Sequence, residues 1–487
     1  MKAIFLLFDT LARAALPPYG NTWVQAPNFA KLAGRAVTFD QCRVGSMPCI
    51  PARRELHTGR YNFLHRSWGP LEPFDDSAPE LLSRAGVYTH CITDHYHYWE
   101  DGGATYLGRY NSWEGARGQE VDKWRPALPR PAAPTHAGLW DPHNWANRQA
   151  LRDERDYPQT QLFDAATGFL RDHAKDDRWF LHLECFSPHP PYFAPPRFHE
   201  LYPERDYRGP LFEWPKYAAL APEETPELVA HLHRQYAALV SYCDFCLGRV
   251  LAAMDEHDLW RDTMLILTTD HGYLHGEHNW WTFCRPPFYD EIAVKPLFVW
   301  DPRTARAGAR CPHLVQTHDL PATLLEYFGQ PRPPDMQGLP LAPAAPCSGR
   351  DAALFGIFGG HVNVTDGRYV YMRAPASAEN APLYEYSLMP THMRARFSPE
   401  ELRGARLAGP FAFTKGCPVL QTPGRAFMAE AARFGTLLFD TQTDPKQEHP
   451  LQDATLEARM IELLRREMAA NDAPREQYQR LGLPAPG

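Results

Sequence analysis

The densest group of chemically reactive residues in the sequence is Cys49-Ile50-Pro51-Ala52-Arg53, followed by Thr58-Gly59-Arg60. Pro51 suits the first turn of a helix, where its missing N–H costs nothing. We therefore expect Cys49 just before that helix, facing free backbone N–H groups and the positive end of the helix dipole. Arg53, one turn later, could donate two parallel hydrogen bonds to an oxyanion. The pattern predicts a seat for a tetrahedral anion, although a buried cysteine in a helix cap is the plainer alternative.

Further polar residues follow the apolar runs that we interpret as buried strands. Lys2 to Phe8 ends in Asp9, and Met264 to Thr269 is followed by Asp270 and His271. Two other runs, Val87 to Thr93 and Trp179 to Phe186, are followed by the segments 94–97 and 187–189. Ligands of open α/β sheets lie beyond the carboxyl ends of the strands, so these segments are the candidate site.

The elements that position these residues alternate between helix and strand over most of the chain. The clearest helix runs from Leu232 to Met254, where apolar residues recur every three or four positions. Such alternation predicts an α/β fold with a large, mostly parallel sheet between helical layers. The proline-rich stretch from Gly329 to Pro346 predicts a boundary, giving a catalytic domain over 1–345 and a smaller α+β domain over 346–487. The latter is expected to end in an amphipathic helix from Leu456 to Met468.

Composition limits the classes of partner. The chain has 487 residues and a net charge of −8, so it carries no basic footprint for nucleic acid and no polybasic membrane patch. The apolar run after Lys2 is too short for a signal peptide, and we expect no segment of transmembrane length. Ten scattered cysteines without a secretory signal predict reduced thiols and a cytoplasmic location. Cys243 and Cys246 are expected to be structural.

Together with the CIPAR motif at Cys49, four ordered segments resemble the sulfatase family of the alkaline phosphatase superfamily. They are APNFAKLAGRAVTF, TDHGYLHGEH, HDLPATLLEYFG and LFDTQTDPKQEHPL. In that family Cys-x-Pro-x-Arg directs oxidation of the cysteine to formylglycine. The resemblance implies that the hydrated aldehyde at position 49 is the nucleophile, and that a formylglycine-generating enzyme matures the protein.

The resemblance also implies one divalent metal ion. Its expected ligands are Asp9, Asp270, His271 and residue 49, with Thr10 as a further oxygen donor. Carboxylates suit Ca²⁺, Mg²⁺ or Mn²⁺, and the imidazole favours Mn²⁺. Many sulfatases carry two successive aspartates where this chain has Asp9-Thr10, so the metal's identity stays open. By the same resemblance His189 is expected near the leaving group or the sulfate oxygens.

Two cationic positions of the family are missing. The usual Lys-x-His after the third strand is aligned with Asp94 and Tyr96, with His95 and His97 one step away. In the absence of the second lysine, Arg285 or His278 is the candidate substitute. Fewer fixed cations would suit a singly charged ester. The adjacent Trp280 and Trp281 suggest an apolar rim for an aryl or alkyl leaving group.

Three functions are therefore weighed. The leading one is hydrolysis of a small-molecule sulfate ester, such as an aryl sulfate. The second is a phosphonate monoester hydrolase or phosphodiesterase on the same scaffold, which the missing cations would suit. The third is a non-catalytic metal- or sugar-binding relative, which the intact modification motif and metal aspartates disfavour. The natural substrate and the oligomeric state, including a homo-oligomer, are left open.

Overall fold

The computed structural model describes residues 1–341 and 349–485. Its centre is an eight-stranded sheet in the order β12-β2-β11-β8-β1-β6-β4-β5. The strands are β1 (Lys2–Phe8), β2 (Val37–Arg43), β4 (Tyr88–Thr93), β5 (Ser112–Gly115), β6 (Trp179–Cys185), β8 (Thr263–Thr268), β11 (Val294–Trp300) and β12 (Arg310–Gln316). Only β11 is antiparallel to its neighbours in this sheet. The expected large, mostly parallel sheet is confirmed.

Strand β1 shows why the sheet is buried on both faces. All seven of its residues are buried, and it pairs in parallel with β6 and β8. Ile4, Leu6 and Phe8 belong to one hydrophobic cluster, and the alternating residues Ala3, Phe5 and Leu7 belong to another. Because side chains alternate across a strand, a continuous apolar run is what a centrally placed parallel strand requires.

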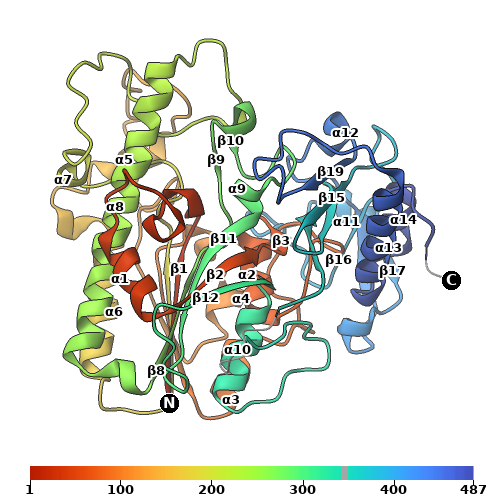
Figure 1. Ribbon diagram of the computed structural model, residues 1–487, viewed down its shortest axis with the longest axis horizontal. Coiled ribbons are helices and arrows are strands. Elements are labelled where there is room, and N and C mark those ends of the chain that lie inside the picture. Colours follow the sequence, from red (N-terminus) through yellow and green to blue (C-terminus); the bar gives the residue numbers. More distant parts are fainter. Residues whose placement is uncertain (342–348, 486–487) are drawn as a thin grey trace.

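The helices form two layers, one on each side of the sheet (Figure 1). Each hydrophobic cluster includes residues of one layer. On one side of the sheet lie α1 (Pro27–Arg35), α6 (Pro158–Asp172) and α8 (Pro226–Glu256). On the other side lie α2 (Cys49–Thr58), α3 (Ala78–Arg84) and α10 (Asp319–Tyr327). The sheet is thus held between two layers, and its C-terminal strand ends are left for loops.

Helix α8 is the expected long helix, and it extends beyond the predicted range. By length and composition it could cross a membrane, so the expectation that no segment has this character is wrong. However, 78% of its most apolar stretch is buried inside the protein, where it packs against α1, α6 and α7 (Pro196–His199). It serves as a core helix of this fold, and it carries the buried free thiols Cys243 and Cys246.

The C-terminal part is built on a five-stranded sheet in the order β19-β15-β14-β13-β3. Its strands are β3 (Ser46–Met47), β13 (Ala353–Ile357), β14 (Val362–Thr365), β15 (Tyr369–Arg373) and β19 (Leu437–Asp440). The predicted terminal helix is α13 (Ala454–Ala470), which packs on this sheet through Met460, Leu464 and Met468. The predicted boundary at 345/346 lies outside the described residues. Strand β3, which ends two residues before Cys49, belongs to this C-terminal sheet and joins the two parts of the chain.

A second small sheet in the C-terminal part consists of β16 (Tyr384–Ser387), β18 (Val419–Pro423) and β17 (Arg406–Ala408). The loop between β16 and α11 (Pro399–Arg403) contains Arg394. Eight described cysteines are free thiols, whereas Cys311 is disulfide-bonded. The expectation of reduced thiols therefore fails at that one position, and the cytoplasmic location stays a prediction.

Candidate active site and metal centre

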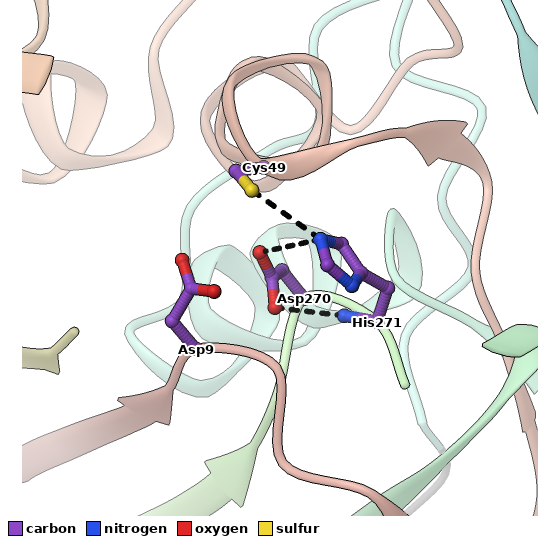
Figure 2. Close-up of side chains that lie close together, drawn as sticks. All are labelled: Asp9, Cys49, Asp270 and His271. Atoms are coloured by element: carbon purple, nitrogen blue, oxygen red, sulfur yellow. Dashed lines mark hydrogen bonds and ion pairs between the residues drawn. The ribbon is translucent and has the colours of Figure 1, made fainter. Parts of the chain in front are cut away.

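Four side chains that could bind a metal converge beyond the C-terminal edge of the central sheet. Asp9, Cys49, Asp270 and His271 are all buried, and one potential ligand atom of each lies within 4.8 Å of the others. Figure 2 shows them directed towards a common centre, Asp9 and Asp270 from the loops after strands and Cys49 from the start of a helix. The sequence predicted this grouping, and the fold brings all four residues together.

The two aspartates meet because β1 and β8 are parallel neighbours. Asp9 directly follows β1, and Asp270 comes two residues after β8. Thr10, with a left-handed φ of 60°, links them: its backbone N–H donates to Asp270 Oδ1 at 2.9 Å and its hydroxyl donates to Asp9 Oδ1 at 2.6 Å. Thr10 therefore orients the carboxylates, and its role as a metal ligand stays a prediction.

Cys49 is the first residue of α2, whereas it was expected to lie just before the helix. Its Sγ lies 3.3 Å from Nε2 of His271. Burial, together with the charges of Asp9 and Asp270, raises the pKa of the Cys49 thiol well above its ordinary value. A thiol in this setting remains protonated, whereas cysteine nucleophiles react as thiolates. In the cluster without a cation, the unmodified side chain is therefore a thiol and not a thiolate.

His271 presents one ring nitrogen to the cluster. Its Nδ1–H donates to the carbonyl oxygen of Gly272 at 2.9 Å, and Phe283 stacks on the ring at 4.3 Å between centroids. These contacts fix the ring and direct Nε2 towards Cys49 and Asp270. This is how a metal-ligating histidine is usually held, with its other nitrogen donating to a carbonyl.

The electrostatics of the cluster also fit a divalent cation. Burial and the neighbouring Asp270 raise the pKa of Asp9 to about 7. Burial alone would raise the pKa of Asp270 too, but His271 and Arg53 bring it below its ordinary value. Two carboxylates this close repel one another, and a shared cation removes that repulsion. The residues present therefore fit a site for one hard or borderline divalent ion.

Arg53 does not have the role that was expected of it. Its guanidinium donates to Asp270 Oδ2 at 2.6 Å, to Asp9 Oδ2 at 2.7 Å and to the Cys49 carbonyl at 3.1 Å. Its Nε donates to Glu184 at 2.7 Å. Four of its five N–H groups are thus occupied by the protein. Arg53 holds the ligand carboxylates in place and is not a free fork for a substrate anion.

Glu184 at the end of β6 was missed by the sequence analysis. It is fully buried and accepts hydrogen bonds from Arg53 and from the Tyr98 hydroxyl, at 2.7 and 2.9 Å. The signal was present, because a carboxylate within a fully buried strand needs a charged partner.

The loop after β4 differs from the predicted alignment. Asp94 turns away from the cluster: it accepts from the backbone N–H of Phe186 at 2.6 Å and from Gln119 at 2.7 Å. His95 points inward instead, with Nδ1 3.7 Å from Asp9 Oδ2. Both His95 ring nitrogens are buried without a hydrogen-bond partner in the described chain. His95 and His97 therefore lie where the alignment had placed Asp94 and Tyr96, in the positions of the missing Lys-x-His.

Tyr96 and His189 lie at the edge of this region. Tyr96 contacts Phe186, which in turn packs on His189 with 4.6 Å between ring centroids. His189 Nδ1–H donates to the Pro190 carbonyl, so its Nε2 is left for other partners. Glu120, a second residue that the sequence analysis missed, bonds to the Tyr96 hydroxyl. The roles predicted for Tyr96 and His189 remain predictions, but both lie close to the cluster.

The proposed substitutes for the second lysine are paired with carboxylates outside the cluster, and their role at the substrate stays a prediction. Arg285 pairs with Glu430 at 3.3 Å, and His278 stacks on Tyr289 and lies 3.5 Å from Glu291. The expected aromatic rim also fails, because Trp280 and Trp281 are buried in β10 (Trp280–Thr282).

One cation that the sequence did not indicate reaches this region from the C-terminal part. Arg394 Nη2 lies 3.3 Å from the Tyr96 hydroxyl and 3.1 Å from His97 Nε2. No local pattern around Arg394 could have identified it, because its partners lie about 300 residues earlier in the chain.

Comparisons with known proteins identify the family and the fold. The sequence profile named Sulfatase matches residues 2–330. The chain is 23% identical over 378 residues to an arylsulfatase of Clostridium perfringens, covering 69% of this chain and 77% of the relative. It is 25% identical over 381 residues to the multifunctional alkaline phosphatase superfamily protein PehA of Trinickia caryophylli, covering 66% and 71%. The solved phosphonate monoester hydrolase of Agrobacterium radiobacter superposes with a TM-score of 0.67, at 18% identity over 99% of this chain and 96% of that chain.

Proposed function

The chain belongs to the sulfatase family, and on that premise we propose that it hydrolyses small-molecule sulfate esters with a formylglycine derived from Cys49. The observation that carries the proposal is the cluster of Asp9, Asp270 and His271 around Cys49. That cysteine begins a helix within Cys-Ile-Pro-Ala-Arg, and its thiol is held protonated. The Cys-x-Pro-x-Arg pattern, which directs the oxidation of the cysteine to formylglycine in the sulfatase family, supports the conversion of residue 49.

Asp9, Asp270, His271 and the oxygen of a converted residue 49 would hold one divalent ion. Bound there, the ion would supply positive charge that lowers the pKa of a coordinated hydroxyl and stabilises charge on the ester. The imidazole Nε2 favours Mn²⁺ over Ca²⁺, and Mg²⁺ is a third candidate. Arg53 and Thr10 keep the two carboxylates in position for this task.

In the proposed reaction, residue 49 is a hydrated aldehyde with two hydroxyl groups. One hydroxyl loses its proton and its oxygen attacks the sulfur, while the bond between sulfur and the alcohol or phenol oxygen breaks. The leaving oxygen takes up a proton, for which His189 is the candidate donor. The second hydroxyl then loses its proton, the C–O bond to the sulfate breaks, and the aldehyde is restored. A serine could complete the first step but not this release.

A phosphonate monoester hydrolase or phosphodiesterase is the second candidate function. The observation in its favour is that the expected lysine positions hold no lysine, and that Arg285 and His278 are paired elsewhere. Such substrates carry one negative charge, as sulfate monoesters do. The non-catalytic alternative has less support, because the potential ligands all converge. A cytoplasmic location and maturation by a formylglycine-generating enzyme are parts of this proposal.

The test is steady-state kinetics of the matured, metal-loaded enzyme on 4-nitrophenyl sulfate, a 4-nitrophenyl phosphonate monoester and a 4-nitrophenyl phosphodiester. The shared leaving group isolates the preference for the transferred group. The highest kcat/KM for the sulfate supports the leading proposal, and the highest value for a phosphorus ester supports the second. No turnover of any of the three by aldehyde-containing protein would contradict both.

A further inference from the structure

Arg394 lies in the loop between β16 and α11, in the C-terminal part of the chain. Met393 directly precedes Arg394, and its carbonyl oxygen accepts a hydrogen bond from the backbone N–H of Gly102 at 2.9 Å. This bond fastens the loop to the segment that follows β4. The loop is closed on itself by a bridge between Thr391 and Arg396. Its position beside the catalytic strand ends is therefore defined by main-chain contacts.

The Arg394 side chain is held mainly by neutral groups. Nη2 donates to His97 Nε2 and to the Tyr96 hydroxyl, and the guanidinium lies 5.0 Å over the Trp68 ring. His97 can accept at Nε2 because its Nδ1–H donates to Glu100. Its carboxylate neighbours are Glu120 and Glu100, and the distance from Arg394 Nε to Glu100 Oε2 is long, at 4.0 Å. The side chain is 54% exposed, so most of its N–H groups remain open to a ligand.

A short series of contacts connects Arg394 to the cluster. The His97 ring lies 5.2 Å from the His95 ring, and His95 Nδ1 lies 3.7 Å from Asp9 Oδ2. Neither ring nitrogen of His95 has a hydrogen-bond partner among the described residues. Because buried polar groups are normally hydrogen-bonded, His95 is available to a polar ligand.

The charges of the site require another cation. Asp9, Asp270 and Glu184 contribute three negative charges, and Arg53 contributes one positive charge. Two buried neighbours, Lys295 and Glu120, add one charge of each sign and cancel in the sum. A divalent ion would bring the sum to zero. An anionic ester would then enter a buried site without net positive charge. Arg53 could not bind it through two hydrogen bonds, because four of its five N–H groups already donate to protein atoms.

We propose that Arg394 binds the anionic group of the ester, so that the C-terminal part supplies the specificity-determining cation of this active site. This inference rests on the proposed function. It replaces the lysine that was expected from the catalytic part with an arginine about 300 residues later in the chain. Arg394 would favour substrates with a single negative charge at the transferred group, because it adds one positive charge to a neutral site.

Kinetics of Arg394→Ala, Arg394→Lys and Arg396→Ala test this assignment. Arg396 is an exposed arginine in the same loop and serves as the matched control. We expect Arg394→Ala to lower kcat/KM between about tenfold and a hundredfold, the usual effect of losing a charged hydrogen bond. Arg394→Lys should recover part of the loss, and Arg396→Ala should stay within about twofold of wild type. Free guanidinium should partly restore Arg394→Ala and leave Arg396→Ala unchanged, which a merely structural role would not produce.

A second measurement does not depend on turnover. Titration of inorganic sulfate into the metal-loaded proteins should show weaker binding to Arg394→Ala than to Arg396→Ala, by about the same factor. Equal sulfate affinity and equal kcat/KM for these two variants would overturn the inference while leaving the proposed function intact. Loss in Arg394→Ala without guanidinium rescue, accompanied by a lower melting temperature, would also overturn it. If wild type turns over none of the esters, the proposed function fails, and sulfate binding alone decides the role of Arg394.

Discussion

The active site has a floor and a rim that are built differently. The floor consists of Asp9, Cys49, Arg53, Glu184, Asp270 and His271, which are buried and bonded to one another. The rim consists of His95, Tyr96, His97, Glu120, His189 and Arg394. There, His95 has no partner for either ring nitrogen within the described residues, and Arg394 is half exposed.

This difference separates chemistry from recognition. In the floor nearly every polar atom has a partner inside the protein, so the floor can hold a metal and a nucleophile but has little left for substrate. The rim joins the loop after β4 to the C-terminal part, and its free polar atoms face the place where an ester must bind. Changes in the floor should therefore abolish the reaction, whereas changes in the rim should alter which ester reacts.

The largest effect is expected for Cys49→Ser. Serine cannot become an aldehyde in the same maturation and cannot release a bound sulfate, so steady-state kcat should fall about a thousandfold or more. The matched control is Cys243→Ser, because Cys243 is equally buried but lies in α8. It should keep its kcat and lose only a modest amount of stability. Full turnover by Cys49→Ser would remove residue 49 from the chemistry.

Asp9→Asn and Asp270→Asn should have the next largest effect. Each replaces an anionic ligand by a neutral one, so metal content and kcat/KM should both fall by about a hundredfold or more, measured by mass spectrometry of bound metal and by initial rates. Asp94→Asn is the control, because Asp94 is a buried aspartate near the same sheet edge with partners at Phe186 and Gln119. If Asp94→Asn lost as much metal as Asp9→Asn, the assignment of Asp94 outside the metal site would be wrong.

Selectivity for charge should be a smaller effect that belongs to the rim. With a neutral floor and one open cation, a monoanionic aryl sulfate should react with a kcat/KM at least about tenfold above that of the dianionic aryl phosphate, which corresponds to ~1.4 kcal/mol. Burial raises the pKa of Asp94 to about 7, and its carboxylate faces away from the cluster. Asp94→Asn should therefore leave this ratio unchanged. A preference of the wild type for the phosphate monoester would refute the charge argument.

The most gradual effect concerns the pH dependence of metal affinity. Burial and Asp270 raise the pKa of Asp9 to about 7 in the metal-free protein. Below that pH the carboxyl is protonated, and a metal ion must displace the proton. Metal affinity should thus increase by at most about tenfold per pH unit between pH 5 and 7 through this group and level off above pH 7. Calorimetry in buffers of different ionisation enthalpy measures the released proton, and a pH-independent affinity would contradict the assignment.

Most of the floor could be predicted from sequence because it depends on local patterns. Apolar runs that end in aspartate mark strand ends, and parallel neighbours bring those ends together, as Asp9 and Asp270 show. The same reasoning gave α8 and α13 close to their observed bounds. Arg53 was placed correctly but given the wrong partners, since sequence does not show that three carboxylates already surround it.

The rim was predicted less well for two physical reasons. Side chains of a short loop can face opposite ways at successive positions, so a shift of one residue exchanged Asp94 and Tyr96 for His95 and His97. Arg394 reaches the site only through tertiary packing of the C-terminal part against the segment after β4. Long-range contacts of this kind leave no periodic or spaced signal in the chain.

The central claim is that residue 49 acts as formylglycine in a floor built to hold a metal. Its most direct test is to prepare the protein with graded amounts of the maturation enzyme and to measure, for each sample, the aldehyde fraction of the Cys49 peptide and the kcat at saturating metal. We predict that kcat is proportional to the aldehyde fraction and extrapolates to zero for the pure thiol. A kcat that does not depend on that fraction, or a peptide that remains a thiol in every active sample, would contradict the account.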